Sequence, residues 1–582
     1  MNNPAHEPTQ QPPFFSPFNH VLDTNHFPNA EETKLLHSVL QTPQRKVAEL
    51  NAHIARLETT LEQLRTERDS LQNYIDSHRA LLSPFRRFPE DVLREVFLWC
   101  LDPYPVRSTR RAPLLLTTIC KYWRDIALRT PRLWSSIHVY IPRCWNERQF
   151  EALVHARVAG FKRWLELSGS TPLYLSVTFP YQGIGANSYE TVQSMVKMNQ
   201  FVVNALLQFR SRWKDVRFSG VLPAFLADAT TLRTDEMPLL ECLRITSLKS
   251  TVYGYHTMYA DRTVEDLIRA APSLHTLDYS FDSYDVPSLP VPWGQMTEIS
   301  LHSRQGSLGA QHALILISKM ANSLQKCSLW IIPTRIDNNI RIHLPSLKSL
   351  ELSFQDTRGI GAIVDAQVDH FETIQASLNA LTCPSLQHLT VDGEAAVTES
   401  PFVQFFEQSG CSLVSFSTRL PLRGNALVGC LETMPGVKTL QLRSSVFWGT
   451  QQDTPAAIRA MTPASSFHDG NVLCPSLERL IVADLHPVDA EVLMELLSKR
   501  GRELKVVKAF FNTVPQADLK RWERYRSKVT ELRKEGVSIE WRFPKVYVPV
   551  GEVEDSVDEG HPLSTTSLDG VSHLAMRQME SY

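Results

Sequence analysis

The residues able to carry out covalent chemistry are scattered along the chain and form no recognisable motif. The patterns G-x-x-x-x-G-K-[ST], H-E-x-x-H and G-x-S-x-G, which mark nucleotide, zinc-protease and serine-hydrolase sites, do not occur. The nine cysteines form no C-x-x-C pair, and the nineteen histidines have no metal-ligand spacing. Cys100 and Cys120 lie on apolar faces of predicted helices, which predicts core thiols. We expect a non-catalytic chain without metal or cofactor; the alternative is an enzyme with a cryptic site in its insertions.

Recognition chemistry is concentrated instead in "RRFPEDVLREVFLWCL", residues 86–101. Pro89 suits the first position of a helix, and the two acids after it complement the helix dipole. At 100° per residue the apolar side chains cover an arc of about 200°, twice what a surface helix needs to bury. One face can pack inside its own small domain, and the remaining apolar face requires a partner.

The residues that follow complete a small helical module over 83–140. A polar loop, "DPYPVRSTRRAP", leads to "LLLTTICKYWRDIAL", which places Leu116, Ile119 and Trp123 on one helix face. "RTPRLWSSIHVYI" then brings Leu133 and Trp134 next to a short alternating strand. A module of this size buries little apolar surface by itself, so surplus apolar surface on it indicates docking.

These residues resemble an F-box. The family pattern has a Leu-Pro-like dipeptide, a Leu/Ile helix, a Val-Ser/Cys-x-x-Trp step and a closing Leu-Trp, and this chain has counterparts to each, with Phe88 in place of the first Leu. With the "LLSPFRRFP" lead, the heptad helix before it and "FKRWLELSGSTPLYLSV" after it, the match resembles an expanded fungal class. The resemblance implies a Skp-type adaptor, and through it a cullin–RING ubiquitin ligase. The adaptor-binding residues implied are Phe88, Pro89, Leu93, Val96, Phe97, Leu116, Ile119, Trp123, Leu133 and Trp134.

A long heptad pattern precedes this module. Residues 1–43 are rich in Pro, Asn, Gln and Thr and are predicted to be flexible. From 44 to 82, apolar residues alternate at steps of three and four, with Arg68 and His78 as the exceptions, which predicts a coiled-coil helix. The helix could self-associate or capture a partner helix, or it could fold back on the domain behind it. A connecting helix is predicted over 141–170.

The largest segment, 171–545, repeats a Pro-x-Leu-x-x-Leu-x-apolar unit. The clearest copies begin at 238, 272, 345, 384, 435 and 475, weaker ones lie near 213, 296, 323, 412 and 503, and amphipathic helices often precede them. The spacing of roughly 29 residues resembles an irregular leucine-rich repeat solenoid. The predicted fold class is therefore α/β, with short parallel strands and helices stacked so that neighbours bury each other's apolar faces.

Two further segments are singled out by composition. "TVYGYHTMYADRT" places Tyr253, Tyr255 and Tyr259 in one insertion, where they either anchor a target or close a gap between repeats. Residues 546–582 contain "GEVEDSVDEG" and are predicted to be a disordered acidic tail.

Charge and hydropathy narrow the function classes. With 60 basic and 62 acidic residues there is no basic excess to bind nucleic acid, and no apolar run approaches the ~18 residues of a membrane helix. The amino terminus lacks a secretory signal pattern, so a cytoplasmic or nuclear location is expected. We expect a substrate-recognition subunit that binds a Skp-type adaptor through 83–140 and a target protein through the solenoid. The alternative is a non-degradative interaction scaffold assembled through the coiled coil.

Overall fold

The computed structural model describes residues 16–82, 84–141, 147–179, 189–220, 233–246, 264–281, 289–303, 308–337, 340–355, 369–393, 399–422, 426–443, 454–463, 472–511 and 519–543. The chain forms two compact units, residues 1–93 and 94–582. The predicted acidic tail over 546–582, the insertion with Tyr253, Tyr255 and Tyr259, and residues 1–15 lie outside the described residues.

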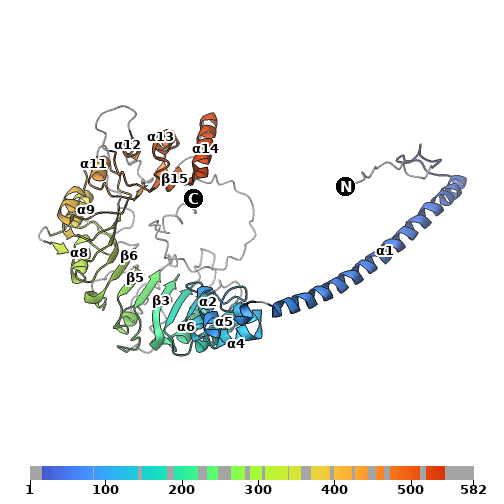
Figure 1. The fold of residues 1–582 in the computed structure, drawn as a ribbon, viewed down its shortest axis with the longest axis horizontal. Coiled ribbons are helices and arrows are strands. Elements are labelled where there is room, and N and C mark those ends of the chain that lie inside the picture. Colours follow the sequence, from blue (N-terminus) through green and yellow to red (C-terminus); the bar gives the residue numbers. More distant parts are fainter. Residues whose placement is uncertain are drawn as a thin grey trace. The chain divides into compact units, whose positions relative to one another are not determined.

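The first unit is dominated by one helix, α1 (Ala30–Leu81), followed by the short η1 (Pro84–Arg87) (Figure 1). The helix begins earlier than the predicted residue 44, because Asn29 and Glu32 form a capping box. The Asn29 Oδ1 accepts from the backbone N–H of Glu32 at 2.9 Å, and the Glu32 carboxylate accepts from the N–H of Asn29 at 2.8 Å. Pro43 lies inside the helix. The prediction of a flexible segment is therefore wrong for residues 30–43.

A compact set of four short helices lies at the start of the second unit. These are α2 (Glu90–Trp99), which spans the boundary between the units, α3 (Leu116–Ile119), α4 (Lys121–Leu128) and η2 (Pro131–Trp134). Cys120 has an extended backbone that ends α3, and its sulfur accepts from the N–H of Trp123 to start α4. The predicted single helix over residues 114–128 is thus two helices that meet at Cys120.

A fourteen-stranded parallel sheet forms the body of the second unit, and each strand pairs with the next along the chain. Every one of the eleven repeat copies contains one strand. Three strands, β1, β2 and β16, lack the repeat motif. The strands are β1 (Ser136–Tyr140), β2 (Leu173–Thr178), β3 (Trp213–Ser219), β4 (Cys242–Thr246), β5 (Thr276–Phe281), β6 (Glu298–Ser303), β7 (Lys326–Ile331), β9 (Ser349–Phe354), β11 (His388–Asp392), β12 (Ser415–Thr418), β13 (Thr439–Arg443), β14 (Arg479–Leu485), β15 (Val506–Phe511) and β16 (Ser538–Arg542).

Helices connect the strands and cover one face of the sheet, and Figure 1 shows α8, α9 and α11 along the outer side of the strands. The segment predicted as a connector, 141–170, contains α5, which links two paired strands as the other repeat helices do. The helices are α5 (Glu147–Leu167), α6 (Tyr189–Leu207), α8 (Ala310–Lys319), α9 (His370–Asn379), α10 (Val403–Ser409), α11 (Ala426–Glu432), α12 (Thr454–Ala460), α13 (Ala490–Arg500) and α14 (Leu519–Lys534), with η3 (Arg210–Arg212), η6 (Trp293–Gln295), η8 (Pro487–Asp489) and a two-stranded sheet of β8 (Ile342–His343) and β10 (Leu381–Thr382).

The core of this unit is a row of apolar side chains that runs from strand to strand in register. Leu277 pairs with Ile299, which pairs with Cys327 and then Leu350, and all four are buried. Each strand hides its apolar residues on the helix-covered side because successive side chains of a strand point to opposite faces. The unit is therefore an α/β stack in which neighbouring repeats supply one another's core, as the sequence predicts.

Candidate functional site

Helix α2 is apolar on two sides, and only one of them is buried. Leu93 and Phe97 have no exposed surface, whereas Val92 is 42% and Trp99 is 88% exposed. On a helix with 100° per residue, Trp99 points roughly opposite to the buried pair. The large apolar arc read from the sequence is thus divided into a core face and an unpartnered face.

Helices α3 and α4 add further exposed apolar side chains. Leu115 is 39%, Ile119 is 52% and Tyr122 is 44% exposed. The Arg124 Nε donates to the carbonyl of Thr117 at 2.7 Å and ties the two helices together. Trp123 is half-buried, and its ring centroid lies 4.8 Å from that of Phe97, so α4 packs on the inner face of α2. Rigid short helices therefore carry these exposed side chains.

The ten residues implied by the F-box resemblance separate into core and surface residues. Phe88, Pro89 and Ile119 are exposed, and Val96 and Trp123 are half-buried. The others are buried in this chain and cannot be contact residues for a partner without rearrangement: Leu93, Phe97, Leu116, Leu133 and Trp134. Four further exposed apolar residues lie outside this set: Val92, Trp99, Leu115 and Tyr122. Helical phase in the sequence alone indicates Val92 and Trp99.

The closing Leu-Trp pair joins the helical module to the first repeat. The Trp134 Nε1 donates to the carbonyl of Ala127 at 2.8 Å, and its ring lies edge-on to Trp164 of α5 at 4.9 Å. The Trp164 Nε1 in turn donates to the carbonyl of Ser136 at the start of β1. The motif's last residues thus fix the module on the sheet.

The polar loop after α2 covers the free edge of the sheet at β1. The N–H of His138 donates to the carbonyl of Pro105 at 2.9 Å, and the Ser136 hydroxyl donates to the carbonyl of Pro103 at 2.6 Å. Tyr104 is buried with the Arg217 guanidinium 4.6 Å from its ring centroid. Burial, with the neighbouring Asp215 carboxylate, raises the pKa of the Tyr104 hydroxyl well above its usual range. The loop shields backbone groups that an edge strand would otherwise leave unpaired.

The face of the sheet opposite the buried apolar row is polar along almost its whole length. One in-register row, called here the central polar row, has thirteen polar residues and one apolar residue, Ile481: His138, Ser176, Arg217, Arg244, Asp278, Ser300, Ser328, Glu351, Thr390, Ser417, Gln441, Ile481, Lys508 and Glu540. Its members bond across strands, as in His138–Ser176 at 2.9 Å and Ser328–Glu351 at 3.1 Å. His138, Ser176, Ser417 and Gln441 are buried, whereas the other polar members are half-buried, so the exposed part of the row offers hydrogen-bond donors and acceptors rather than an apolar groove.

The described cysteines are mostly inert core thiols. Burial raises the pKa of Cys242 and Cys383 to about 12 and that of Cys474 to about 11. Cys100 is the exception to the prediction because it is exposed at the end of α2, and Cys120 is half-buried. In the described part of the chain, no three His, Cys, Asp or Glu residues are grouped so as to hold a metal ion.

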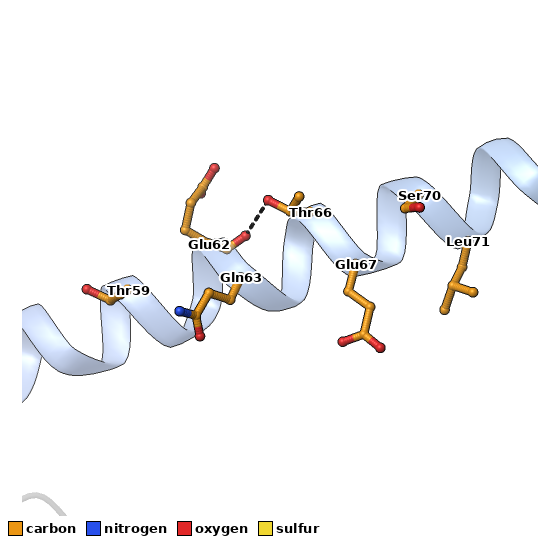
Figure 2. A pocket seen from close by; sticks show the side chains of 7 residues that line it. All are labelled: Thr59, Glu62, Gln63, Thr66, Glu67, Ser70 and Leu71. Carbon is orange, nitrogen blue, oxygen red and sulfur yellow. Dashed lines mark hydrogen bonds between the residues drawn. The ribbon is translucent and has the colours of Figure 1, made fainter.

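A shallow hollow on α1 is lined by residues of that helix alone: Thr59, Glu62, Gln63, Thr66, Glu67, Ser70 and Leu71 (Figure 2). The Thr66 hydroxyl donates to the backbone carbonyl of Glu62, and the polar side chains project from the helix surface. A single helix cannot enclose a small molecule, so we assign no ligand to this hollow.

Comparison with known proteins adds little to these observations. No family model and no curated protein sequence matches the chain. Among solved structures, the crystal structure of the Rad7 and Elc1 complex in yeast aligns over 72% of this chain and 94% of that chain, at 12% identity and a TM-score of 0.34. None of the described helices has a stretch long and apolar enough to cross a membrane.

Proposed function

We propose that this chain is the substrate-recognition subunit of a Skp–cullin–F-box ubiquitin ligase. Residues 83–140 bind a Skp-type adaptor, and the sheet of the second unit binds the target protein. The chain holds the target near a conjugating enzyme on another subunit, so its contribution is proximity rather than covalent chemistry. The observation that carries the proposal is the exposed apolar face of α2, within a sequence that resembles an F-box.

The adaptor surface proposed here is built on Val92, Val96 and Trp99 of α2, with Ile119 and Tyr122 from the next two helices. Trp99 alone is 88% exposed, an unusual state for so large an apolar side chain. Tryptophan and tyrosine dominate the binding energy of many protein interfaces when they enter a partner's pocket. The buried Leu93 and Phe97 support this surface from beneath.

The target surface proposed here is the central polar row and its neighbours on the same face. Its half-buried members present hydroxyl, carboxylate, guanidinium and ammonium groups at strand spacing, which suits recognition by hydrogen bonds and charge. Arg244 bonds to Asp215 at 3.1 Å, and Lys326 bonds to Glu298 at 2.7 Å, so several charges are paired before any target arrives. Polar surfaces of this kind select partners by complementarity more than by buried apolar area.

Co-purification of the full chain with a recombinant Skp-type adaptor tests the first half of the proposal. We expect Trp99→Ala and Val92→Asp each to lower adaptor affinity at least 30-fold, the loss that a hot-spot residue of about 2 kcal/mol produces. Matched controls outside the module are Phe27→Ala and Val488→Asp, since Phe27 is 91% and Val488 is 69% exposed. A wild-type chain that does not bind the adaptor, or controls that lose as much affinity as the α2 variants, would contradict it.

The alternative is a scaffold without a role in degradation, and the exposed apolar positions of α1 favour it because they equip the chain for assembly. Leu57 is 56% and Leu64 is 58% exposed. Blocking the cullin distinguishes the two functions. A receptor's targets stop turning over and accumulate, whereas the partners of a scaffold keep their abundance. Adaptor binding without any change in turnover would support the scaffold.

A further inference from the structure

Helix α1 carries one exposed apolar seam. The eight members within the helix are each 42–58% exposed, and they follow a heptad in which a and d positions alternate: Val47, Leu50, Ile54, Leu57, Leu61, Leu64, Leu71 and Ile75. Apolar residues at these spacings lie along one side of a helix. In the described part of the chain these side chains stay about half exposed, so the seam is not buried.

The residue types at the a and d positions of the seam differ, and this difference indicates how many helices associate and in which direction they run. The a positions hold Val47, Ile54, Leu61, Arg68 and Ile75, and the d positions hold Leu50, Leu57, Leu64, Leu71 and His78. β-Branched residues at a with leucine at d favour two parallel strands, because the side chains meet at different angles in the two layers. A single charged a residue, here Arg68, fixes register because every other alignment would place it against an apolar layer.

The positions flanking the seam agree with a parallel, in-register pair. In such a pair the g position of one helix faces the next e position of the other. His53 then faces Glu58 of the second copy, and Tyr74 faces Arg79 of the second copy. The other pairs are Lys46 with Asn51, Thr60 with Arg65 and Glu67 with Gln72, so no pair joins two like charges.

The opposite side of the helix does not offer a second seam. It carries Thr59, Glu62, Gln63, Thr66 and Ser70, which are polar and exposed (Figure 2). A helix with one apolar seam buries that seam against one partner helix, so the seam favours a pair over a larger bundle. If each seam residue hides about 80 Å², a pair buries roughly 1,300 Å², which lies within the range of stable protein interfaces.

We propose that α1 pairs with α1 of a second copy of this chain as a parallel, in-register, two-stranded coiled coil over residues 47–82. The inference does not depend on the adaptor or on any target. Because the two helices run in the same direction, Leu82 of both copies lies at the same end of the coil, and the helical module of each copy follows in sequence from that end.

Multi-angle light scattering of the purified full chain tests the association. We expect a dimer at micromolar concentration and a monomer for the double variant Leu57→Glu/Leu64→Glu. The matched control, Thr59→Glu/Thr66→Glu, makes the same chemical change on the opposite side of the same helix and should remain dimeric. Circular dichroism should show that the second unit, with its helices and its sheet, stays folded in both variants. A monomeric wild type, a larger oligomer, or a dimer unaffected by the seam variant would overturn the proposal.

Disulfide trapping tests the direction of the helices. In a background with Cys100→Ser, Leu50→Cys places two sulfurs at the same d layer of a parallel coil, within the 4.4–6.8 Å Cα separation that a disulfide spans. We expect mild oxidation to trap this variant as a covalent dimer linked through residue 50, and Thr59→Cys to remain unlinked. An antiparallel pair would separate the two copies of residue 50, so a failure to link while the dimer persists would contradict the parallel arrangement.

Discussion

At the scale of single residues, Arg500 shows how one buried side chain can hold two backbone segments of a repeat together. It is the last residue of α13, is 2% exposed, and donates to four backbone carbonyls, those of Met461, Leu473, Cys474 and Pro475, at 3.1–3.3 Å. Its Nε pairs with Glu503 at 2.7 Å. These carbonyls follow α12 and precede β14, so the guanidinium supplies the donors that buried backbone carbonyls need.

Arg500→Leu should destabilise the C-terminal repeats by about 3 kcal/mol or more, because it leaves several buried carbonyls without donors. Hydrogen exchange is the suitable measurement, since a repeat array opens locally. We expect faster exchange in residues 472–485 and 506–511. Arg502→Leu is the control, because Arg502 is 89% exposed and its ion pair with Glu535 is long, at 3.5 Å. Equal protection in the two variants would contradict the assigned role.

The cysteines give a second prediction at this scale. Burial raises the pKa of Cys242 and Cys383 to about 12, so very little of either thiol is in the reactive thiolate form at neutral pH. Among the described cysteines, iodoacetamide should therefore label the exposed Cys100 first, as peptide mass spectrometry can resolve over time. Labelling of Cys242 or Cys383 at a comparable rate would mean that the sheet opens far more readily than its packing implies.

At the scale of elements, the loop between α2 and α3 serves as the edge cover of the sheet. Tyr104 is its anchor, buried against Arg217 of β3. Its raised pKa means that folding favours the protonated hydroxyl. This stabilising contribution is complete below the unfolded value near 10 and is lost as the pH rises through the folded value.

Tyr104→Phe should therefore reduce the alkaline loss of stability. Between pH 9 and pH 11.5 we expect the melting temperature of the wild type to fall more steeply than that of the variant, because the variant has no hydroxyl to ionise. The buried cysteines titrate in the same range, and comparing the two chains cancels their effect. Parallel curves for the two chains would show that Tyr104 does not ionise on unfolding in this range.

Elements were predictable from sequence where a repeated pattern specified them. Each copy of the repeat forms a strand because its last apolar residues alternate with polar ones and are buried on one face, as Leu350 and Leu352 of β9 are. Strands β1, β2 and β16 lack that pattern and are recruited by pairing with a neighbour. The start of α1 escaped prediction because residues 1–43 are rich in Pro, Asn, Gln and Thr and lack apolar periodicity, although the capping box at residues 29–32 is present in the sequence. The roles of Leu133 and Trp134 depend on α5, whose packing no local pattern reveals.

At the scale of the whole molecule, the chain combines two kinds of stability. The first unit is a helix with an exposed apolar seam, whereas the second holds a continuous core of its own. The candidate surfaces follow this division: α1 for self-association, the short helices for an adaptor, and the polar side of the sheet for a target. A single helix of this type gains most of its stability from its partner rather than from propensity.

Deleting residues 1–82 tests that division. We expect the remaining chain to keep the calorimetric transition of the sheet unit within about 2 °C, since none of the sheet's core residues lies in the deleted segment. The dimer should be lost. A marked fall in the transition temperature would instead indicate that α1 folds back on the domain behind it, the alternative that its sequence also allows.

The parallel strands divide their residues between two tasks. On β9, Leu350 and Leu352 are buried while Ser349, Glu351 and Ser353 lie on the polar side. Exchanging a half-buried hydroxyl of the central polar row, such as that of Ser300 or Thr390, for a charge alters the surface at little cost to the core, because polar and apolar side chains point to opposite faces of the strand. Lineages of such a chain can therefore drift in what they recognise while keeping the same architecture, so specificity is the trait that natural variation should reach first.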